Sequence, residues 1–264
     1  MGSSHSKEEA LMGVEKVKPL GRGAFGEAFL VKKNSQLLVM KKINVKNMDP
    51  KLVKYQLQEA ELLRSIQHPN IVSYKAHAFK DDMVCILLEY CEGGDLLQEI
   101  KRQAETKRPF AEETVSEWIR QLASGLKYIH AIRIIHRDVK PNNIFLSSNR
   151  KTLKIGDFGV SKLLPDGSLF TSTMLGTPVY MGPEVLQGSR YGAKADMYSL
   201  GASIFHVATF SYPQPHKEVP VVYSVRLRHL IAVLMSQRPE DRPSANDTLD
   251  YLAGHTFNHG LQLL

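Results

Sequence analysis

The hydrophobic pattern changes character about one third of the way along the chain. The first part contains short segments rich in Val, Leu and Phe, separated by glycines or by Asn34-Ser35, a pattern typical of an antiparallel meander. Strands are predicted over 16–20, 26–32, 36–45, 71–79 and 83–90. We therefore predict that this part is mostly β-sheet.

One helix interrupts the predicted strands. In the stretch 51–66, residues that can face one side recur every three or four positions, as in an amphipathic helix. They are Leu52, Tyr55, Glu59, Leu62, Leu63 and Ile66. The stretch ends at His68-Pro69-Asn70, where proline breaks the helical pattern.

After Glu92-Gly93-Gly94 the pattern becomes helical. Asp95 is a plausible N-cap for a helix over 96–104, and 113–130 carries an apolar stripe through Trp118, Leu122, Leu126 and Ile129. The predicted fold class is therefore α+β, with two lobes that meet near 89–94 and a cleft between them. We assign 1–15 to a flexible N-terminus, 16–90 to the first lobe, 91–257 to the second and 258–264 to a tail.

Composition narrows the class of protein. The chain has 264 residues, 43% of them hydrophobic and 23% charged, which is typical of a globular protein rather than a disordered, collagen-like or coiled-coil chain. The net charge of +7 favours anionic partners without choosing between nucleic acid, membrane, nucleotide and acidic protein. Cys85 and Cys91 have no partners at metal spacing, so neither a disulfide framework nor a zinc site is indicated.

The N-terminus leaves two interpretations open. No apolar run approaches the ~18–20 residues of a membrane span, and MGSSHSKEEA lacks the hydrophobic segment of a secretory signal. We therefore expect a protein that neither spans a membrane nor is secreted. However, Met1-Gly2-Ser3-Ser4-His5-Ser6 matches the pattern in which Gly2 carries a myristoyl chain, and the alternative is a flexible polar segment.

A glycine-rich segment precedes the second predicted strand. Residues 20–28, LGRGAFGEA, contain G-x-G-x-x-G, which is also the dinucleotide-binding fingerprint. That fingerprint opens a helix, whereas this segment leads into the strand FLVKK, which favours a β-turn-β flap over phosphates. An ordinary hairpin is the alternative. Lys41 ends an apolar strand, and Glu59 in the predicted helix could hold its ammonium group through an ion pair.

The most specific motifs lie in the second lobe. HRDVKPNN at 136–143 is followed by Asp157-Phe158-Gly159, then by Gly176-Thr177-Pro178 and Gly182-Pro183-Glu184. In this order the sequence resembles a eukaryotic-type protein kinase across residues 16–257, and it implies the bilobal kinase fold.

The resemblance implies a role for each motif residue. Asp138 would act as catalytic base toward the acceptor hydroxyl, and Asn143 and Asp157 would hold Mg²⁺ or Mn²⁺. Lys41, fixed by Glu59, would contact the phosphates of ATP. The pattern of serine/threonine kinases is matched by Lys140, which would steady the γ-phosphate, and by Thr177, which would line the substrate pocket.

The nucleotide would lie against the first lobe and its exit. The resemblance assigns to it Leu20, Gly21, Arg22, Gly23, Ala24, Phe25, Gly26, Glu27, Ala28, Val39, Lys41, Leu88, Glu89, Cys91 and Phe145. Most kinases have Val where Ala28 stands and Ala where Val39 stands, an exchange that conserves volume. The NIMA-related (NEK) kinases show the same exchange, and GEAFLVKK, HPNIV, EYCEGGDL and NNIFL are also similar to that branch.

The family pattern also suggests how the site is braced and activated. Asp196 would brace the catalytic loop, and Glu184 would pair with Arg242. Because Arg137 precedes Asp138, a phosphate on the activation segment would pair with that arginine. The acceptor candidates are Thr171, Ser172 and Thr173, of which Thr173 best matches the family position. A solvated, hydroxyl-rich loop is the alternative.

Two departures from the family affect the expected function. Between 210 and 223 the second lobe lacks the helix and loops that the family normally has there, and Gly182 replaces the usual Ala, which could loosen the segment. We expect a serine/threonine kinase that uses ATP with Mg²⁺ and modifies protein substrates, cytoplasmic, with partial nuclear location or weak membrane association left open. The alternatives are a pseudokinase that serves as a nucleotide-binding scaffold, a small-molecule phosphotransferase and, for the basic charge, a nucleic-acid binder, for which no recognised fold is present.

Overall fold

The computed structural model describes residues 12–23, 26–46, 48–49, 63–157, 178–188, 192–214 and 216–257. The chain divides into two compact units. The first comprises 1–68 and 72–91, and the second comprises 69–71 and 92–264. Each unit is described by itself.

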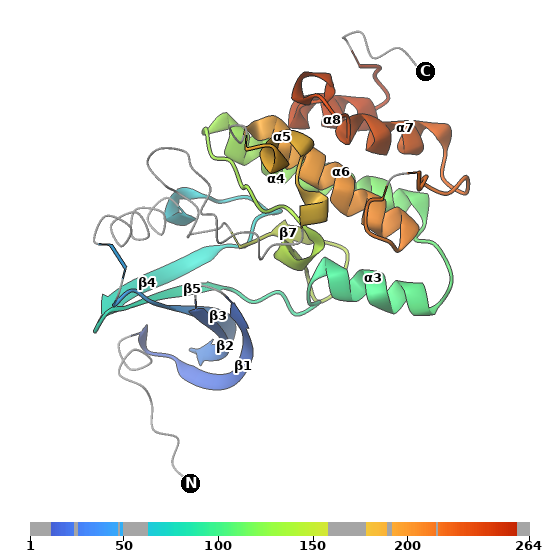
Figure 1. Ribbon diagram of the computed structural model, residues 1–264. Coiled ribbons are helices and arrows are strands. Elements are labelled where there is room, and N and C mark those ends of the chain that lie inside the picture. Colours follow the sequence, from blue (N-terminus) through green and yellow to red (C-terminus); the bar gives the residue numbers. More distant parts are fainter. Residues whose placement is uncertain are drawn as a thin grey trace. The chain divides into compact units, whose positions relative to one another are not determined.

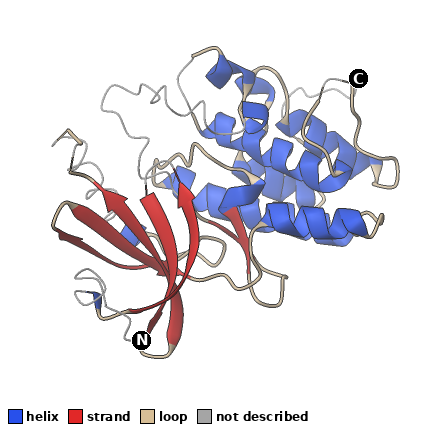
Figure 2. Cartoon of the chain, turned by 60° about the horizontal axis from the view of Figure 1, so that its bottom comes forward, coloured by secondary structure: helices blue, strands red, loops and turns tan. Residues whose placement is uncertain are grey.

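The first unit is built on one antiparallel sheet of five strands, whose order is β1-β2-β3-β5-β4 (Figure 2). The strands are β1 (Glu15–Gly23), β2 (Gly26–Lys33), β3 (Gln36–Asn44), β4 (Tyr74–Lys80) and β5 (Met83–Glu89). Asn34 and Ser35, with φ of 46° and 66°, form the two-residue turn between β2 and β3. Asp81 and Asp82 (φ 50° and 60°) connect β4 to β5 in the same way. Asn and Asp adopt this left-handed conformation more readily than most side chains, which fits Asn34, Asp81 and Asp82.

The two faces of this sheet have different contents because side chains alternate along each strand. Phe29, Val31, Leu38, Met40, Cys85 and Leu87 lie on one face and form a buried core cluster together with Met12 and Val14. Met12 and Val14 belong to this core although the sequence assigned 1–15 to a flexible N-terminus.

Two predicted elements of the first lobe differ from the structure or lie outside it. The strand predicted over 71–79 begins at Tyr74. Ile71 belongs to the second unit, where it forms a parallel bridge with Ile155. Of the helix predicted over 51–66, only residues from Leu63 onward are among those described, and Leu63 and Ile66 are buried there. Leu52, Tyr55, Glu59 and Leu62 lie outside the described residues.

The second unit is mainly helical (Figure 1). Its elements are α3 (Leu96–Glu105), α4 (Glu112–Ala131), η1 (Pro141–Asn143), β6 (Ile144–Leu146), β7 (Leu153–Ile155), η3 (Pro178–Tyr180), α5 (Pro183–Leu186), α6 (Ala193–Thr209), α7 (Val225–Leu234), η4 (Pro239–Asp241) and α8 (Ala245–Leu252). β6 and β7 form a two-stranded antiparallel sheet. This arrangement confirms the bilobal α+β prediction.

The predicted helix signals are confirmed in α3 and α4. Asp95 caps α3, since its Oδ1 accepts a hydrogen bond of 2.8 Å from the Gln98 backbone N–H. The stripe of Trp118, Leu122, Leu126 and Ile129 is buried along α4. The N-cap residue and the apolar spacing therefore predicted these two helices correctly.

The connection from α6 to α7 is short, as the sequence predicted. Within 210–214 and 216–224, the residues described there, the structure has no helix. Phe210 ends α6 in the left-handed conformation (φ 54°) and packs against Phe110, with 5.9 Å between ring centroids. Tyr223 donates a hydrogen bond of 3.1 Å from its hydroxyl to the Phe110 carbonyl. Both ends of the connection are therefore fixed to Phe110, two residues before α4.

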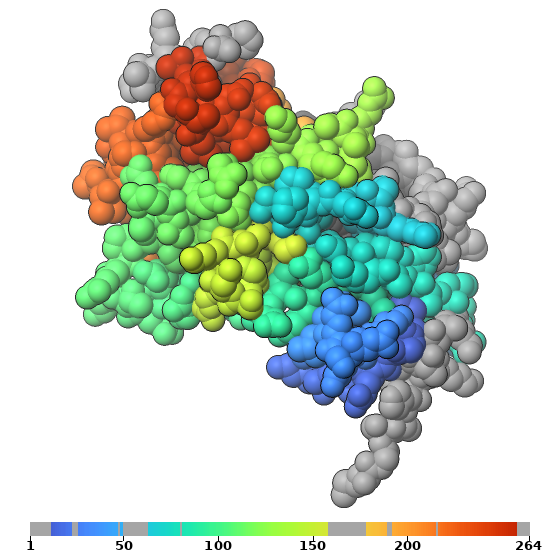
Figure 3. Space-filling view, turned by 180° about the vertical axis from the view of Figure 1, so that it is seen from behind, coloured from blue at the N-terminus to red at the C-terminus, as the bar shows by residue number. Residues whose placement is uncertain are grey.

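Figure 3 shows α7 and α8 side by side, which the contact of Arg226 with the Tyr251 ring confirms.

In the part of the chain that the structure describes, no helix has the length and apolar character needed to cross a membrane.

Two glycines of the glycine-rich segment are expected to differ in their effect on stability. A Cβ at Gly26 would lie 2.0 Å from the Lys42 carbonyl oxygen of β3, and φ there is 154°, whereas a Cβ at Gly21 meets nothing within 4 Å. We predict that Gly26→Ala destabilises the protein by about 2 kcal/mol or more and Gly21→Ala by less than about 1 kcal/mol. Chemical denaturation measures both, and equal losses would contradict the prediction.

Candidate active site

The carboxylate of Asp196 organises the loop that follows α4. This residue lies in the first turn of α6 and is completely buried. Its Oδ2 accepts hydrogen bonds from the His136 backbone N–H (2.9 Å) and His130 Nε2 (2.8 Å), and its Oδ1 accepts one from the Arg137 backbone N–H (2.9 Å). Hydrogen bonds to an ionised acceptor are stronger than neutral ones. The structure thus confirms that Asp196 braces this loop.

Two residues of this region have a strained backbone. Arg137 has φ of 67° and Asp157 has φ of 55°, both in the left-handed region that costs a non-glycine residue about 1–2 kcal/mol. Residues persist in such conformations only where their surroundings fix them, and they gather at functional sites.

His136 connects the two strained segments. Its buried ring has Nε2 at 3.0 Å from the Gly156 carbonyl and Nδ1 at 3.3 Å from the Asp138 backbone N–H. Because Nδ1 faces a donor, it must accept, and the proton therefore resides on Nε2, which donates to Gly156. Burial lowers the pKa of His136, although the charges of Asp196 and Asp138 oppose this effect. The neutral tautomer satisfies both contacts.

Asp138 is held between a cation and an amide. The Lys140 ammonium lies 3.0 Å from Asp138 Oδ2, with less than a fifth of each side chain exposed. Asn143 donates from Nδ2 to the backbone carbonyl and to Oδ2 of Asp138, both at 2.8 Å. Since Nδ2 makes both bonds to Asp138, the amide oxygen of Asn143 takes no part in them. The structure brings Asp138, Lys140 and Asn143 together, as the motif predicted.

Asp157 lies next to this cluster in the fold. The backbone N–H of the preceding Gly156 donates to the Asn143 carbonyl at 2.9 Å, and β6 pairs with β7 immediately before Gly156. The Asp157 residue itself is exposed. The oxygens of one carboxylate and one amide are suited to a hard divalent cation such as Mg²⁺.

In the first unit, several predicted nucleotide residues share one face of the sheet. Lys41 pairs with Ala28 on β2 and with Ile86 on β5, and Val39 pairs with Leu88, so all five side chains point to the face opposite the core cluster. Ala28 and Val39 are diagonal neighbours on this face, which fits the volume exchange inferred from the sequence.

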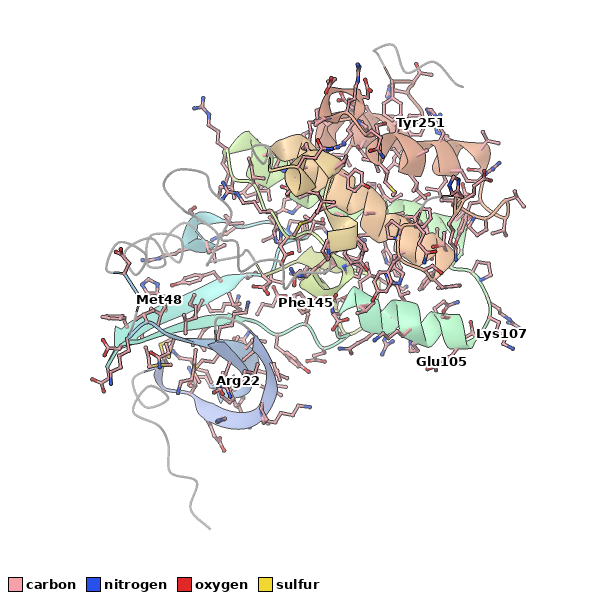
Figure 4. The ribbon with its side chains drawn as sticks, in the orientation of Figure 1. Arg22, Met48, Glu105, Lys107, Phe145 and Tyr251 are labelled. Carbon is pink, nitrogen blue, oxygen red and sulfur yellow. The ribbon has the colours of Figure 1, made fainter. Side chains whose placement is uncertain are left out.

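The other predicted nucleotide residues have varied environments. Leu20, Gly21 and Arg22 are exposed at the end of β1, where Arg22 lies 3.8 Å from Glu27 across the strands. The backbone N–H of Glu89 already donates to the Ser73 carbonyl at 2.8 Å, and Cys91 is buried. Arg22 and Phe145, which lies half-buried on β6, are labelled in Figure 4.

Some predicted site residues lie outside the described part of the chain. These are Gly2, Ala24, Phe25, Glu59, Thr171, Ser172, Thr173 and Thr177.

The ion pair predicted between Glu184 and Arg242 is present. The Arg242 guanidinium is buried and donates from both Nη atoms to the carboxylate, each at 2.7 Å. Burial raises the pKa of Glu184, but the hydrogen bonds from Arg242 outweigh it and the net pKa is lowered. A Cβ at Gly182 would lie 2.6 Å from Glu184 Oε2, so glycine leaves room for this carboxylate.

The sequence did not reveal a cluster of three rings in the second unit. Tyr180 and His206 are buried and lie 2.7 Å apart between Oη and Nδ1, and the Tyr212 ring is 4.7 Å from the His206 ring. Burial, together with the charge of Lys101, lowers the pKa of His206 to about 4. No motif or periodic spacing in the sequence indicated that the rings of these three residues would meet.

The bilobal fold and the braced Asp138 loop define a protein of the kinase class. Comparison with known proteins agrees: the family model described as "Protein kinase domain" matches residues 14–252, and the chain belongs to the protein kinase family.

Relatives of known name share the Nek designation. The chain is 36% identical over 251 residues to mouse serine/threonine-protein kinase Nek4 (88% of this chain, 31% of the relative). It is 36% identical over 250 residues to human Nek5 (88% and 35%) and 38% identical over 250 residues to mouse Nek11 (87% and 40%). These matches confirm the resemblance to NEK kinases. The chain spans only about a third of the length of these relatives.

Removing the charge of Asp196 is expected to loosen the loop. Asp196→Asn places an amide N–H₂ against backbone donors, and we predict a loss of about 3 kcal/mol in the free energy of unfolding. Ser203→Ala, in the same helix, removes only a hydroxyl bond to the Ser199 carbonyl and serves as the control, with a loss below about 1 kcal/mol. Similar losses in urea denaturation would refute the assigned role of Asp196.

The ring cluster is expected to make stability sensitive to acid. In the unfolded chain His206 takes up a proton near its ordinary pKa of 6.5, whereas in the folded state it does so only near 4. Stability contributed by neutral His206 is therefore complete above pH 6.5 and is lost as the pH falls toward 4. His206→Gln should reduce the pH dependence of unfolding in this interval by up to one proton. An unchanged pH dependence would show that His206 does not titrate as stated.

Proposed function

We propose that this chain is a serine/threonine protein kinase that transfers the γ-phosphate of ATP to hydroxyl groups of proteins, with Asp138 as the catalytic base. The observation that carries the proposal is the placement of Asp138 between the Lys140 ammonium and the Asn143 amide on a loop fixed by Asp196. Phosphoryl transfer depends mainly on positioning and charge neutralisation, and this cluster can supply both.

The proposed step balances as a simple displacement. The acceptor hydroxyl gives its proton to the Asp138 carboxylate as its oxygen forms a bond to the γ-phosphorus. The bond between that phosphorus and the oxygen bridging to the β-phosphate breaks, and ADP leaves. The Lys140 ammonium, already beside Asp138, would neutralise charge on the transferred group.

Asn143 and Asp157 would hold the divalent ion, Mg²⁺ or Mn²⁺, that protein kinases generally use with ATP. The Asn143 amide nitrogen donates its hydrogen bonds to Asp138, which leaves the amide oxygen to bind the ion. The second ligand would be the carboxylate of Asp157, an exposed residue. A bound metal ion would neutralise phosphate charge.

The sheet face described above would hold the nucleotide. Lys41 would contact the phosphates and Glu59 would fix it, while Ala28, Val39 and Leu88 would pack on adenine. The glycine-rich segment, Glu89, Cys91 and Phe145 complete the set that the kinase resemblance assigns. Support for these roles comes from the alternation of β3 and the family pattern.

Regulation by the activation segment belongs to the same proposal. Phosphate on Thr173, or on Thr171 or Ser172, would pair with Arg137 and order the segment, and Thr177 would line the acceptor pocket. The protein substrates and partners are proposed only by chemical class, since the chain spans about a third of its named relatives.

Matched substitutions test the proposed chemistry. With Mg²⁺ and ATP, Asp138→Asn should lower phosphate transfer to a mixture of serine and threonine peptides at least about a hundredfold. Lys41→Met should lower it comparably. Asp81→Asn, in the turn between β4 and β5, and Lys42→Met, on the opposite face of β3, should leave transfer nearly unchanged.

The outcomes separate the proposal from its alternatives. Phosphate that the wild type incorporates into itself should map to Thr173 when the sites are identified by mass spectrometry. If ATP binds in a way that depends on Lys41 but no phosphate is transferred, the proposed kinase activity would be contradicted and a pseudokinase favoured.

A further inference from the structure

Three exposed valines gather where the chain enters α7. Val221 and Val222 occupy the turn before the helix and Val225 is its first residue, with 83%, 62% and 67% of their surfaces exposed. They follow the shortened connection from α6, which leads into α7 in Figure 1. Single exposed apolar residues are common, whereas three of them within five positions of the chain are a candidate interaction surface.

The neighbouring charged residue on α7 is an arginine. Arg228 follows Val225 by three positions on α7, so their side chains are neighbours on the helix surface. It is half-buried, and its Nε is buried without a hydrogen-bond partner. Among the described residues no carboxylate pairs with Arg228, whereas the buried Arg242 has Glu184. Because no described carboxylate neutralises the charge of this half-buried arginine, a ligand carboxylate beside the valines would gain a favourable electrostatic interaction.

Other groups near the start of α7 are already engaged. Glu112 accepts hydrogen bonds from the backbone N–H and the hydroxyl of Ser224. Arg226 contacts the Tyr251 ring and donates to the carbonyls of Tyr251 and His255. Arg228 therefore stands apart as the cation of this surface without a partner among the described residues.

We propose that Val221, Val222, Val225 and Arg228, here called the α7 entry surface, form a docking site for a peptide segment of a partner protein that combines aliphatic side chains with a carboxylate. The aliphatic groups cover the valines and the carboxylate pairs with Arg228. The proposal does not depend on phosphate transfer, because it concerns binding alone.

The probe is a fluorescent library of octapeptides, each with two aliphatic residues and one to three Asp or Glu residues. The matched library replaces each carboxylate by its amide. Fluorescence anisotropy with the full chain should find members of the acidic library that bind, while their amide counterparts bind at least about tenfold more weakly. Higher salt should weaken the binding of the acidic peptides more than that of the amide peptides.

Variants assign the binding to the α7 entry surface. Arg228→Gln should lower affinity about tenfold or more, as should Val222→Asp, which puts a like charge against the ligand. Arg133→Gln and Val17→Asp change an exposed arginine and an exposed valine elsewhere and should have no effect. Arg228→Glu should bind peptides in which Lys replaces the acidic residue.

Several results would overturn the proposal. They are equal binding by amide peptides, equal affinity in Arg228→Gln and Arg133→Gln, and no binding by any library member below about 1 mM. A concentration-dependent dimer that Val222→Asp abolishes would assign the surface to a second copy of this chain instead. Circular dichroism and thermal unfolding of each variant confirm that folding is retained, and Val225→Asp replaces Val222→Asp if it is not.

Discussion

The buried carboxylate of Asp196 is the group on which the candidate site depends. A charge removed from water is unfavourable unless donors surround it, and here two consecutive backbone N–H groups and one imidazole do so. Those donors come from the end of α4 and from the loop after it. The same interaction therefore neutralises the desolvation cost of Asp196, holds Arg137 in its left-handed conformation, and places Asp138 beside Lys140 and Asn143.

A second constraint comes from the alternation of β3. Because neighbouring residues point to opposite faces, Met40 is fully buried in the core cluster while Val39 and Lys41 lie on the other face. Burial of Met40 fixes the register of the strand, and a slip by one residue would exchange the two faces. The core of the first unit thus sets the direction of the lysine that we propose contacts ATP.

Much of the fold follows from local signals in the sequence. Short apolar segments predicted the strands, Asn34-Ser35 predicted the turn between β2 and β3, and Asp95 predicted the start of α3. The error at the start of β4 arose because Ile71 pairs with Ile155, a contact distant in sequence that no local pattern reveals. The motif residues of the site were likewise identified from their order along the chain.

Features made by long-range packing could not be predicted in this way. The buried Nε of Arg228, which has no hydrogen-bond partner, and the ring cluster of Tyr180, His206 and Tyr212 depend on how helices pack, not on residue spacing. Burial lowers the pKa of His206 to about 4, yet its sequence neighbours are ordinary helix residues.

The central claim is that the Asp138 loop transfers phosphate to aliphatic hydroxyl groups. Single-turnover transfer from ATP to three peptides that differ only in Ser, Thr or Tyr at the acceptor position tests it most directly. The account predicts phosphoserine and phosphothreonine, no phosphotyrosine, and loss of both products in Asp138→Asn. Transfer to Tyr alone, or equal transfer by Asp138→Asn, would contradict it.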